Sequence, residues 1–210
     1  MEDTENRAIQ SLFAVPLFSK DFKYENKQQF IDHAKNYPSV ENSNAGGFQS
    51  DFLNPAEEIV KDFLDAVMKD VYAAVGFFGL NQGDAFGVNG VWLNINDRDD
   101  WNHIHNHPGC DFAVVVYLKV PKNSGEIVFY NNDPVKQASE FYTTPLGNDT
   151  EFSRLKYAHT PREDSIVIFP SHLFHNVMKN ESDEERISVA LNVSVGRSGH
   201  RFVNNNDWKD

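Results

Sequence analysis

The chain of 210 residues carries 19 Lys and Arg against 31 Asp and Glu, which gives a formal net charge of -12 at pH 7. This acidic balance argues against a nucleic-acid partner, because binding to phosphates needs clustered basic side chains. No apolar stretch reaches the about 20 residues that a membrane-spanning helix requires, and the single cysteine, Cys110, fits a reducing compartment. We expect a cytoplasmic protein with no membrane partner, and the composition leaves the oligomeric state open.

The N-terminal part of the chain begins with an apolar run over residues 9–18, which favours a strand edged by Pro16. Residues 25–37 place apolar side chains among polar ones in the pattern of a short surface helix. Residues 38–54 are rich in Gly, Ser and Asn, which is the composition of a loop.

A longer helix is predicted to begin at Asn54 and Pro55. Asn can cap free N–H groups, Pro suits the first turn, and the acids Glu57 and Glu58 favour the positive end of the helix dipole. Apolar residues recur at helical spacing from there to about Phe78. We expect this helix to lie along the outside of a sheet.

Beyond residue 83 the apolar pattern changes to the period of two that is typical of strands. Strands are predicted over residues 88–96, 111–120, 126–130, 165–169, 175–178 and 185–195. Short strands with frequent turns after a helical region are typical of a jelly roll or barrel. We expect one mainly β domain with flanking helices, a double-stranded β-helix (jelly roll). Its parts are an N-terminal strand and helices (1–83), the barrel core (84–196) and a polar tail (197–210).

The stretch 131–163 is long and polar, and we interpret it as a loop with room for one weak strand. Long loops in compact domains often cover binding sites. One hypothesis is that Phe141, Tyr142 and Phe152 close over a substrate. An ordinary surface excursion is the alternative.

The segment from Trp101 to Gly109 holds three alternating histidines, His103, His105 and His107. Residues two apart on an extended chain point to the same face, so any adjacent pair could chelate a metal ion. Imidazole suits Fe, Zn, Cu and Ni. A further ligand must come from a distant segment, and His175 opens a strand just after the turn at Pro170.

Arg186 begins a strand on which Ser188, Ala190 and Asn192 share its face, while Ile187, Val189 and Leu191 form the other face. Packing of the apolar face would turn the polar one toward the barrel interior. A buried arginine is costly unless it is paired, and no acid lies on its face of this strand. We therefore expect Arg186 and Ser188 to bind a ligand carboxylate. The alternative is that Arg186 pairs with an acid on a neighbouring strand or lies at an exposed turn. Trp92, Asn94 and Asn96 alternate on a neighbouring strand and are candidates to line the same pocket, as is Asn192.

With these residues in place, the sequence resembles the Fe(II)- and 2-oxoglutarate-dependent dioxygenases, whose pattern is His-any-Asp, a distal His, and Arg-any-Ser. It is similar in particular to a small group of uncharacterised proteins of this type from bacteria and their viruses. The likeness extends over about residues 88–195 and rests on Trp92 and Asn94, His105 to Gly109, Tyr117-Leu118, Phe169-Pro170 with His175, and Arg186 to Ser188. Because this group includes viral proteins, the resemblance is compatible with a virus-encoded protein that acts in the cytoplasm of a host.

The resemblance implies that His105 and His175 bind Fe(II), and that Arg186 and Ser188 bind the distal carboxylate of 2-oxoglutarate. Tyr117 stands where related prolyl hydroxylases place a tyrosine that bonds the same carboxylate.

The sequence departs from the family pattern at His107, which occupies the position of the ligand aspartate. Three ligand sets follow from this departure. His107 can be the third ligand, the pair can be His103 and His105, or Asp111 can supply the carboxylate. We favour His107, because His105 and His107 directly precede Pro108-Gly109 and the Tyr117 strand.

The resemblance implies a hydroxylase that couples 2-oxoglutarate decarboxylation to the oxidation of a C–H bond, on a small molecule or a protein side chain. Two rival functions fit the histidines alone. One is a cupin-type enzyme with three histidine ligands and no 2-oxoglutarate, and the other is a non-catalytic metal-binding jelly roll. Arg186 and Ser188 discriminate against the cupin-type enzyme, which has no need for them at that place. A site closed to added ligands, or one that holds four-coordinate zinc, would favour the non-catalytic module.

Overall fold

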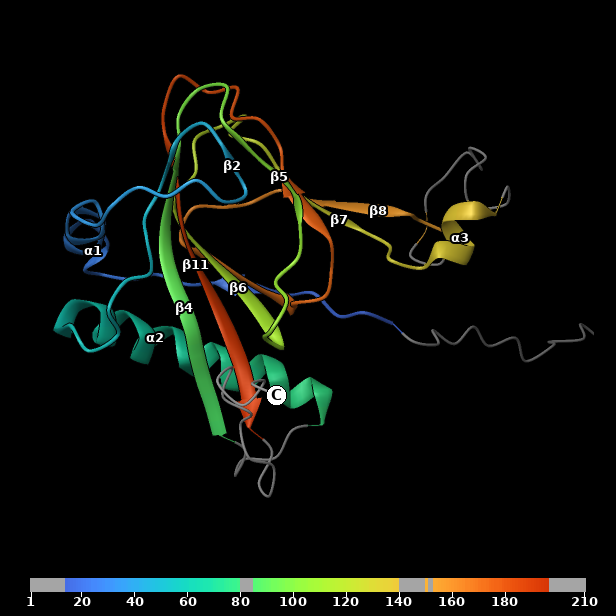
Figure 1. The fold of residues 1–210 in the computed structure, drawn as a ribbon, viewed down its shortest axis with the longest axis horizontal. Coiled ribbons are helices and arrows are strands. Elements are labelled where there is room, and N and C mark those ends of the chain that lie inside the picture. The colour runs from blue at the N-terminus through green and yellow to red at the C-terminus, as the bar shows by residue number, and fades with distance from the viewer. Residues whose placement is uncertain (1–13, 80–84, 140–149, 151–152, 197–210) are drawn as a thin grey trace, which may run out of the picture.

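The computed structural model describes residues 14–79, 85–139, 150 and 153–196. Their strands form two antiparallel sheets that enclose the interior of a double-stranded β-helix (Figure 1). The first sheet has the strand order β1 (Phe18–Asp21), β9 (Ser165–Pro170), β6 (Phe112–Lys119), β11 (Arg186–Gly196), β4 (Ala85–Asn96) and β3 (Phe48–Gln49). The second has the order β2 (Asn44–Ala45), β5 (Trp101–His105), β10 (His175–Val177), β7 (Ile127–Tyr130) and β8 (Lys156–His159).

Strand β11 lies in the middle of the first sheet, between β6 and β4. Its side chains alternate as predicted: Ile187, Val189 and Leu191 join the hydrophobic core on the outer face of the sheet. Arg186 and Ser188 point the opposite way and line a cavity between the sheets. The period of two in the sequence therefore separates the core from the site.

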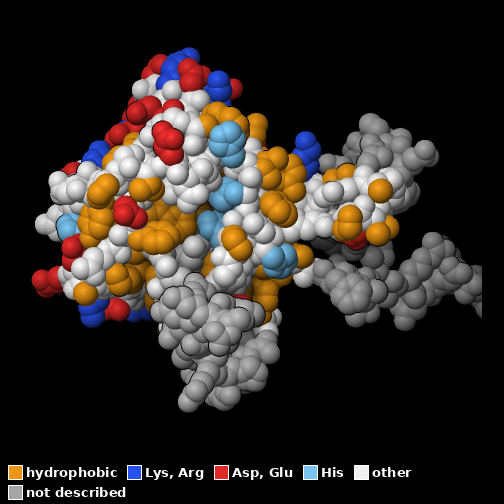
Figure 2. Space-filling view, in the orientation of Figure 1, with side chains coloured by type: hydrophobic (Ala, Val, Ile, Leu, Met, Phe, Trp, Pro, Cys, Tyr) orange, Lys and Arg blue, Asp and Glu red, His pale blue; other side chains and the backbone are white. Residues whose placement is uncertain are grey.

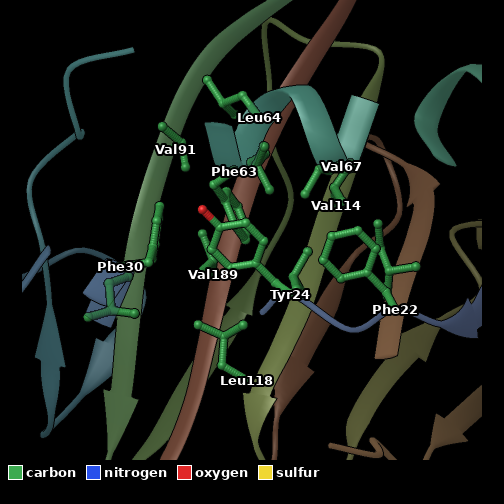
Figure 3. Packing of buried hydrophobic residues seen from close by; sticks show 14 of the residues in the cluster. Phe22, Tyr24, Phe30, Phe63, Leu64, Val67, Val91, Val114, Leu118 and Val189 are labelled. Atoms are coloured by element: carbon green, nitrogen blue, oxygen red, sulfur yellow. The ribbon is translucent and has the colours of Figure 1, made fainter. Parts of the chain in front are cut away.

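Two helices cover the outer face of the first sheet, α1 (Lys27–Ala34) and α2 (Glu58–Val75), and the 3-10 turn η1 (Gly76–Phe78) follows α2 (Figure 1). Phe63 of α2 is fully buried, and its ring lies 4.4 Å from the ring of Phe30 and 5.1 Å from that of Tyr24. These rings lie against apolar side chains of the sheet, including Val114 and Val189 (Figure 3). None of the helices in the described part of the chain is long and apolar enough to cross a membrane.

The predicted helix over 25–37 is confirmed as α1, and the six predicted strands are confirmed with shifts of one to three residues at their ends. The strand predicted over 9–18 is wrong within the described residues: 14–17 form no strand, and β1 begins at Phe18, where pairing to Ile168 begins. Residues 9–13 of that prediction lie outside the described residues.

The start of α2 also differs from the prediction. Asn54 caps a preceding turn, where its Oδ1 accepts a hydrogen bond from the N–H of Ala56, and the helix itself begins at Glu58. The predicted loop over 38–54 contains the two short strands β2 and β3.

The stretch 131–163 holds the expected weak strand, β8, and a short helix that was not predicted, α3 (Pro134–Ala138). Asp133 caps α3 by accepting hydrogen bonds from Val135 and Lys136. Phe141, Tyr142 and Phe152 lie outside the described residues.

Replacing Phe63 by alanine should lower the free energy of unfolding by about 3–5 kcal/mol, because it opens a cavity where α2 meets the sheet. The control is Phe77→Ala, whose side chain is 81% exposed and whose loss should change stability by less than about 0.5 kcal/mol. Urea denaturation followed by circular dichroism measures both. Equal effects of the two substitutions would contradict this account of the core.

Candidate metal centre

Three histidines, His105, His107 and His175, bring one ring nitrogen each within 4.8 Å of one another. His105 ends β5 and His175 begins β10, and the two are paired directly in the antiparallel register. His107 lies two residues beyond β5, where its backbone N–H donates to the carbonyl of Ser171 at 3.0 Å. Segments about 70 residues apart in the chain are thus joined by backbone bonds around the cluster.

The ring orientation of two of the histidines is fixed by the backbone. The Nδ1 atoms of His105 and His175 lie 2.7 Å and 2.9 Å from the carbonyl oxygens of His103 and Leu173. Since a carbonyl can only accept, each Nδ1 carries the proton and each Nε2 presents a lone pair. The Nε2 atoms of His107 and His175 lie 3.4 Å apart.

Burial keeps this cluster uncharged. Desolvation, together with the neighbouring imidazoles, lowers the pKa of His107 to about 4 and that of His175 to about 3, and it also lowers the pKa of His105. The rings are therefore neutral at pH 7, which is the state that binds a metal ion without losing a proton. Three converging neutral imidazoles fit Fe(II), and equally Zn or Ni.

The alternative ligands lie elsewhere. His103 is exposed, and its ring is held 4.3 Å from that of Trp101. Asp111 accepts a hydrogen bond from the N–H of Val195 at 2.8 Å. Within the described residues, the clustered ligand set is therefore His105, His107 and His175, with no carboxylate.

Arg186 lines the same cavity as the histidines and is 1% exposed. Its guanidinium donates to the carbonyls of Ser124 and Gly125 at 2.5 Å and 3.4 Å and to Asn96 Oδ1 at 2.9 Å. All three acceptors are neutral, and no ion pair to Arg186 occurs among the described residues. Burial lowers the pKa of Arg186, as expected for a charge without a full partner.

Glycine is needed at position 125 for this arrangement. Gly125 has a φ of +88°, and a Cβ there would lie 2.3 Å from the carbonyl oxygen of Met178. The turn after β6 can therefore approach β10 and place two carbonyls on Arg186 only with glycine at this position.

Ser188 and Tyr117 complete the polar end of the cavity, because they are paired across β11 and β6. Tyr117 is buried, and burial raises its pKa to about 12, so its hydroxyl remains a donor at neutral pH. Together with Arg186, these side chains present hydrogen-bond donors toward one space.

Trp92, Asn94 and Asn96 line the cavity, but Asn192, which was also a candidate, is not among its lining residues. Ser43 and Asn102 line it without having been predicted. Strict alternation would turn Asn102 away from the face of His105. A register shift between β5 and β10 places Val177 opposite Asn102 and His175 opposite His105, which breaks the alternation. The same irregularity explains why His103 is excluded from the cluster.

The model of a family described as "Putative 2OG-Fe(II) oxygenase" matches residues 90–192, and no curated protein sequence matches the chain significantly. Many solved structures resemble the fold, and three serve as examples. A prolyl-4-hydroxylase from Pseudomonas putida shows 14% identity and a TM-score of 0.56, with 87% of this chain and 94% of that chain covered.

The second is a viral collagen prolyl hydroxylase from Paramecium Bursaria Chlorella virus-1 in complex with 2-oxoglutarate (13% identity, TM-score 0.55, 86% and 96% covered). The third is HygX from Streptomyces hygroscopicus with nickel and 2-oxoglutarate bound (8% identity, TM-score 0.60, 86% and 83% covered). At these identities the likeness shows the fold, the double-stranded β-helix predicted from the sequence.

Replacing His175 by alanine should weaken Fe(II) or Ni(II) binding by at least about 100-fold, because loss of a ligand exceeds the 10–100-fold cost of losing a supporting residue. The matched control is His103→Ala, which should bind metal like the wild type. Anaerobic equilibrium dialysis with metal analysis measures both. Weakened binding in His103→Ala would restore His103 as a ligand.

The metal-free protein should lose stability as the pH falls from 6.5 to about 4. In this window the unfolded chain takes up protons at histidines of ordinary pKa, whereas folded His107 and His175 stay neutral. The free energy of unfolding then falls by at most about 1.4 kcal/mol per pH unit for each histidine. Urea titrations across this range should show a shallower dependence in His107→Gln, and an unchanged slope would contradict the assignment.

Proposed function

We propose, from the match of the 2OG-Fe(II) oxygenase family model to residues 90–192, that the chain is a dioxygenase of this family, with Fe(II) on His105, His107 and His175 and 2-oxoglutarate on Arg186. The main support for this proposal is that the three histidines and Arg186 line the same cavity. Neutral metal ligands lie in one part of it, and a buried guanidinium without a carboxylate partner lies in another. A dicarboxylate that reaches from one to the other satisfies both.

Arg186 and its neighbours bind the cosubstrate in this proposal. The guanidinium attracts the distal carboxylate, and the hydroxyls of Ser188 and Tyr117 donate hydrogen bonds to it. Trp92, Val115 and Ala190 also line the cavity, where Ala190 is paired with the other two, and these largely apolar side chains limit the entry of water. When bound, Fe(II) and 2-oxoglutarate would allow dioxygen to oxidise a C–H bond, with one oxygen atom going to the substrate and the other to succinate as 2-oxoglutarate loses CO2.

The substrate enters from the open face of the barrel in this proposal. In Figure 2, histidine side chains reach the surface there, flanked by hydrophobic side chains. We propose a small molecule or a protein side chain as the substrate, since solved structures of similar fold include a hydroxylase with a peptide fragment and HygX with hygromycin B. The single cysteine supports a cytoplasmic location.

We also propose that the stretch 131–163 closes over the bound substrate. Removing some of its residues should weaken substrate binding and raise turnover that is uncoupled from substrate. Unchanged affinity and coupling would leave the stretch as an ordinary surface excursion.

Anaerobic titration of the metal-free protein with Fe(II) and 2-oxoglutarate tests the proposal. We expect a saturable visible charge-transfer band, because the keto acid chelates a metal held by three protein ligands. Arg186→Ala should weaken 2-oxoglutarate binding by at least about tenfold, since a charged hydrogen bond contributes about 1.5–3 kcal/mol. The band should be lost in His175→Ala.

The control for Arg186→Ala is Arg162→Ala, an arginine at the surface whose side chain pairs with Asp21 and is 64% exposed. This variant should bind 2-oxoglutarate like the wild type. Iron binding with no band at any 2-oxoglutarate concentration would favour a cupin-type three-histidine enzyme and make Arg186 a structural residue. Four-coordinate zinc closed to added ligands would favour a non-catalytic module.

A further inference from the structure

A series of hydrogen bonds leads from Arg186 to Ser43, and all four side chains in it line the cavity. The guanidinium donates to Asn96 Oδ1 at 2.9 Å, and Asn96 Nδ2 lies 3.5 Å from Asn102 Oδ1. Asn102 Nδ2 in turn lies 3.3 Å from Ser43 Oγ. Arg186, Asn96 and Asn102 are buried, so water has little access to the bonds that join them.

Arg186 fixes the direction of every bond in this series. A guanidinium can only donate, so Asn96 must present its oxygen to Arg186 and its NH2 group to Asn102. Asn102 must then present its oxygen to Asn96 and its NH2 group to Ser43. Reversing either amide would place an NH2 group against another NH2 group or against the guanidinium. The Ser43 oxygen is therefore an acceptor toward Asn102.

The hydroxyl proton of Ser43 is left for a ligand. A serine hydroxyl carries one proton, and because Oγ accepts from Asn102, that proton is not used in the bond between them. No acceptor for it occurs among the described residues, and Ser43 lines the cavity. Ser43 therefore presents a hydrogen-bond donor to the cavity, as Arg186 does.

Ser43 begins a segment that crosses from one sheet to the other. Its carbonyl accepts the N–H of His103 at 2.7 Å, and β2, directly after it, pairs with β5 of the second sheet. Next comes β3, which pairs with β4 of the first sheet. Gly47 between β2 and β3 has a φ of +69°, and a Cβ there would lie 2.4 Å from the carbonyl oxygen of Ile95. Backbone pairing on both sides of this turn thus fixes the position of Ser43.

We propose that Ser43 is a further binding residue for the cosubstrate: its hydroxyl donates a hydrogen bond to the carboxylate that Arg186 binds. The inference rests on the function proposed above. A carboxylate supplies the acceptor that the Ser43 proton lacks, and the same group neutralises the guanidinium at the other end of the series. Ser43 lies outside residues 90–192, so the segment that matches the family model does not contain it.

Anaerobic titration of the Fe(II)-loaded protein with two keto acids tests this role through the charge-transfer band. 2-Oxoglutarate carries a distal carboxylate, whereas 2-oxobutyrate has the same keto acid end and a methyl group at the other. Ser43→Ala should weaken the binding of 2-oxoglutarate by about tenfold, because it removes a hydrogen bond to a charged group. The same variant should bind 2-oxobutyrate like the wild type. Ser43→Thr keeps the hydroxyl and should bind both keto acids like the wild type.

A double-mutant cycle tests the series of hydrogen bonds behind Ser43. Asn102→Ala removes the donor that orients the Ser43 hydroxyl, so it should also weaken the binding of 2-oxoglutarate. In the Ser43→Ala background the same substitution should cost less, because the two residues act through one series of bonds. Strictly additive effects would contradict that link. The matched control is Ser19→Ala, an exposed serine on β1, which should bind both keto acids like the wild type.

The role of Ser43 and the proposed function fail in distinguishable ways. A wild type that forms no band with either keto acid would overturn the cosubstrate assignment and the role of Ser43 together. A 2-oxoglutarate band that Arg186→Ala weakens and Ser43→Ala leaves unchanged would overturn the role of Ser43 alone. Equal losses for both keto acids in Ser43→Ala would make Ser43 a structural residue and would overturn its role as well.

Discussion

Burial of the Arg186 guanidinium is the constraint on which the rest of the site depends. Removing such a charge from water is expensive, and the carbonyls of Ser124 and Gly125 with the amide of Asn96 offset only part of that cost. Two of these neutral acceptors depend on Gly125, because only glycine lets the turn after β6 approach β10 closely enough to place them on Arg186. Because these acceptors carry no charge, the positive charge of Arg186 is left for a carboxylate to neutralise.

The histidine in place of the usual aspartate changes the charge at the other end of the cavity. An aspartate ligand would add a negative charge beside an incoming dianion, whereas His107 is neutral at pH 7 because burial lowers its pKa to about 4. A metal ion held by three neutral imidazoles keeps its full double charge. In the proposed arrangement, a dianionic cosubstrate would be attracted by both the metal and Arg186, with no carboxylate of the ligand set to repel it.

Much of this arrangement follows from the sequence, because the barrel obeys the period of two wherever its strands are regular. The alternation in β11 separates Ile187 and Val189 from Arg186 and Ser188, and the structure confirms that separation. The features that could not be predicted lie where the period breaks. Asn102 enters the cavity and His103 leaves the cluster because of one register shift, which depends on pairing with a strand about 70 residues away. The sequence pattern of β5 alone therefore does not predict this register shift.

Register shifts in the described sheets accompany the site itself. One lies between His175 and Val177, one between Ile187 and Ser188, and one between Asn192 and Val193. A regular strand can offer only every second side chain to a cavity, at a fixed spacing, whereas a bulge moves one side chain relative to its neighbours at the cost of a local break in the ladder. Packing of the helices on the first sheet stabilises the fold and offsets the cost of these breaks in the ladder. Regular strands thus stabilise the barrel, and its irregular pairs aim the side chains that could bind a metal ion and a carboxylate.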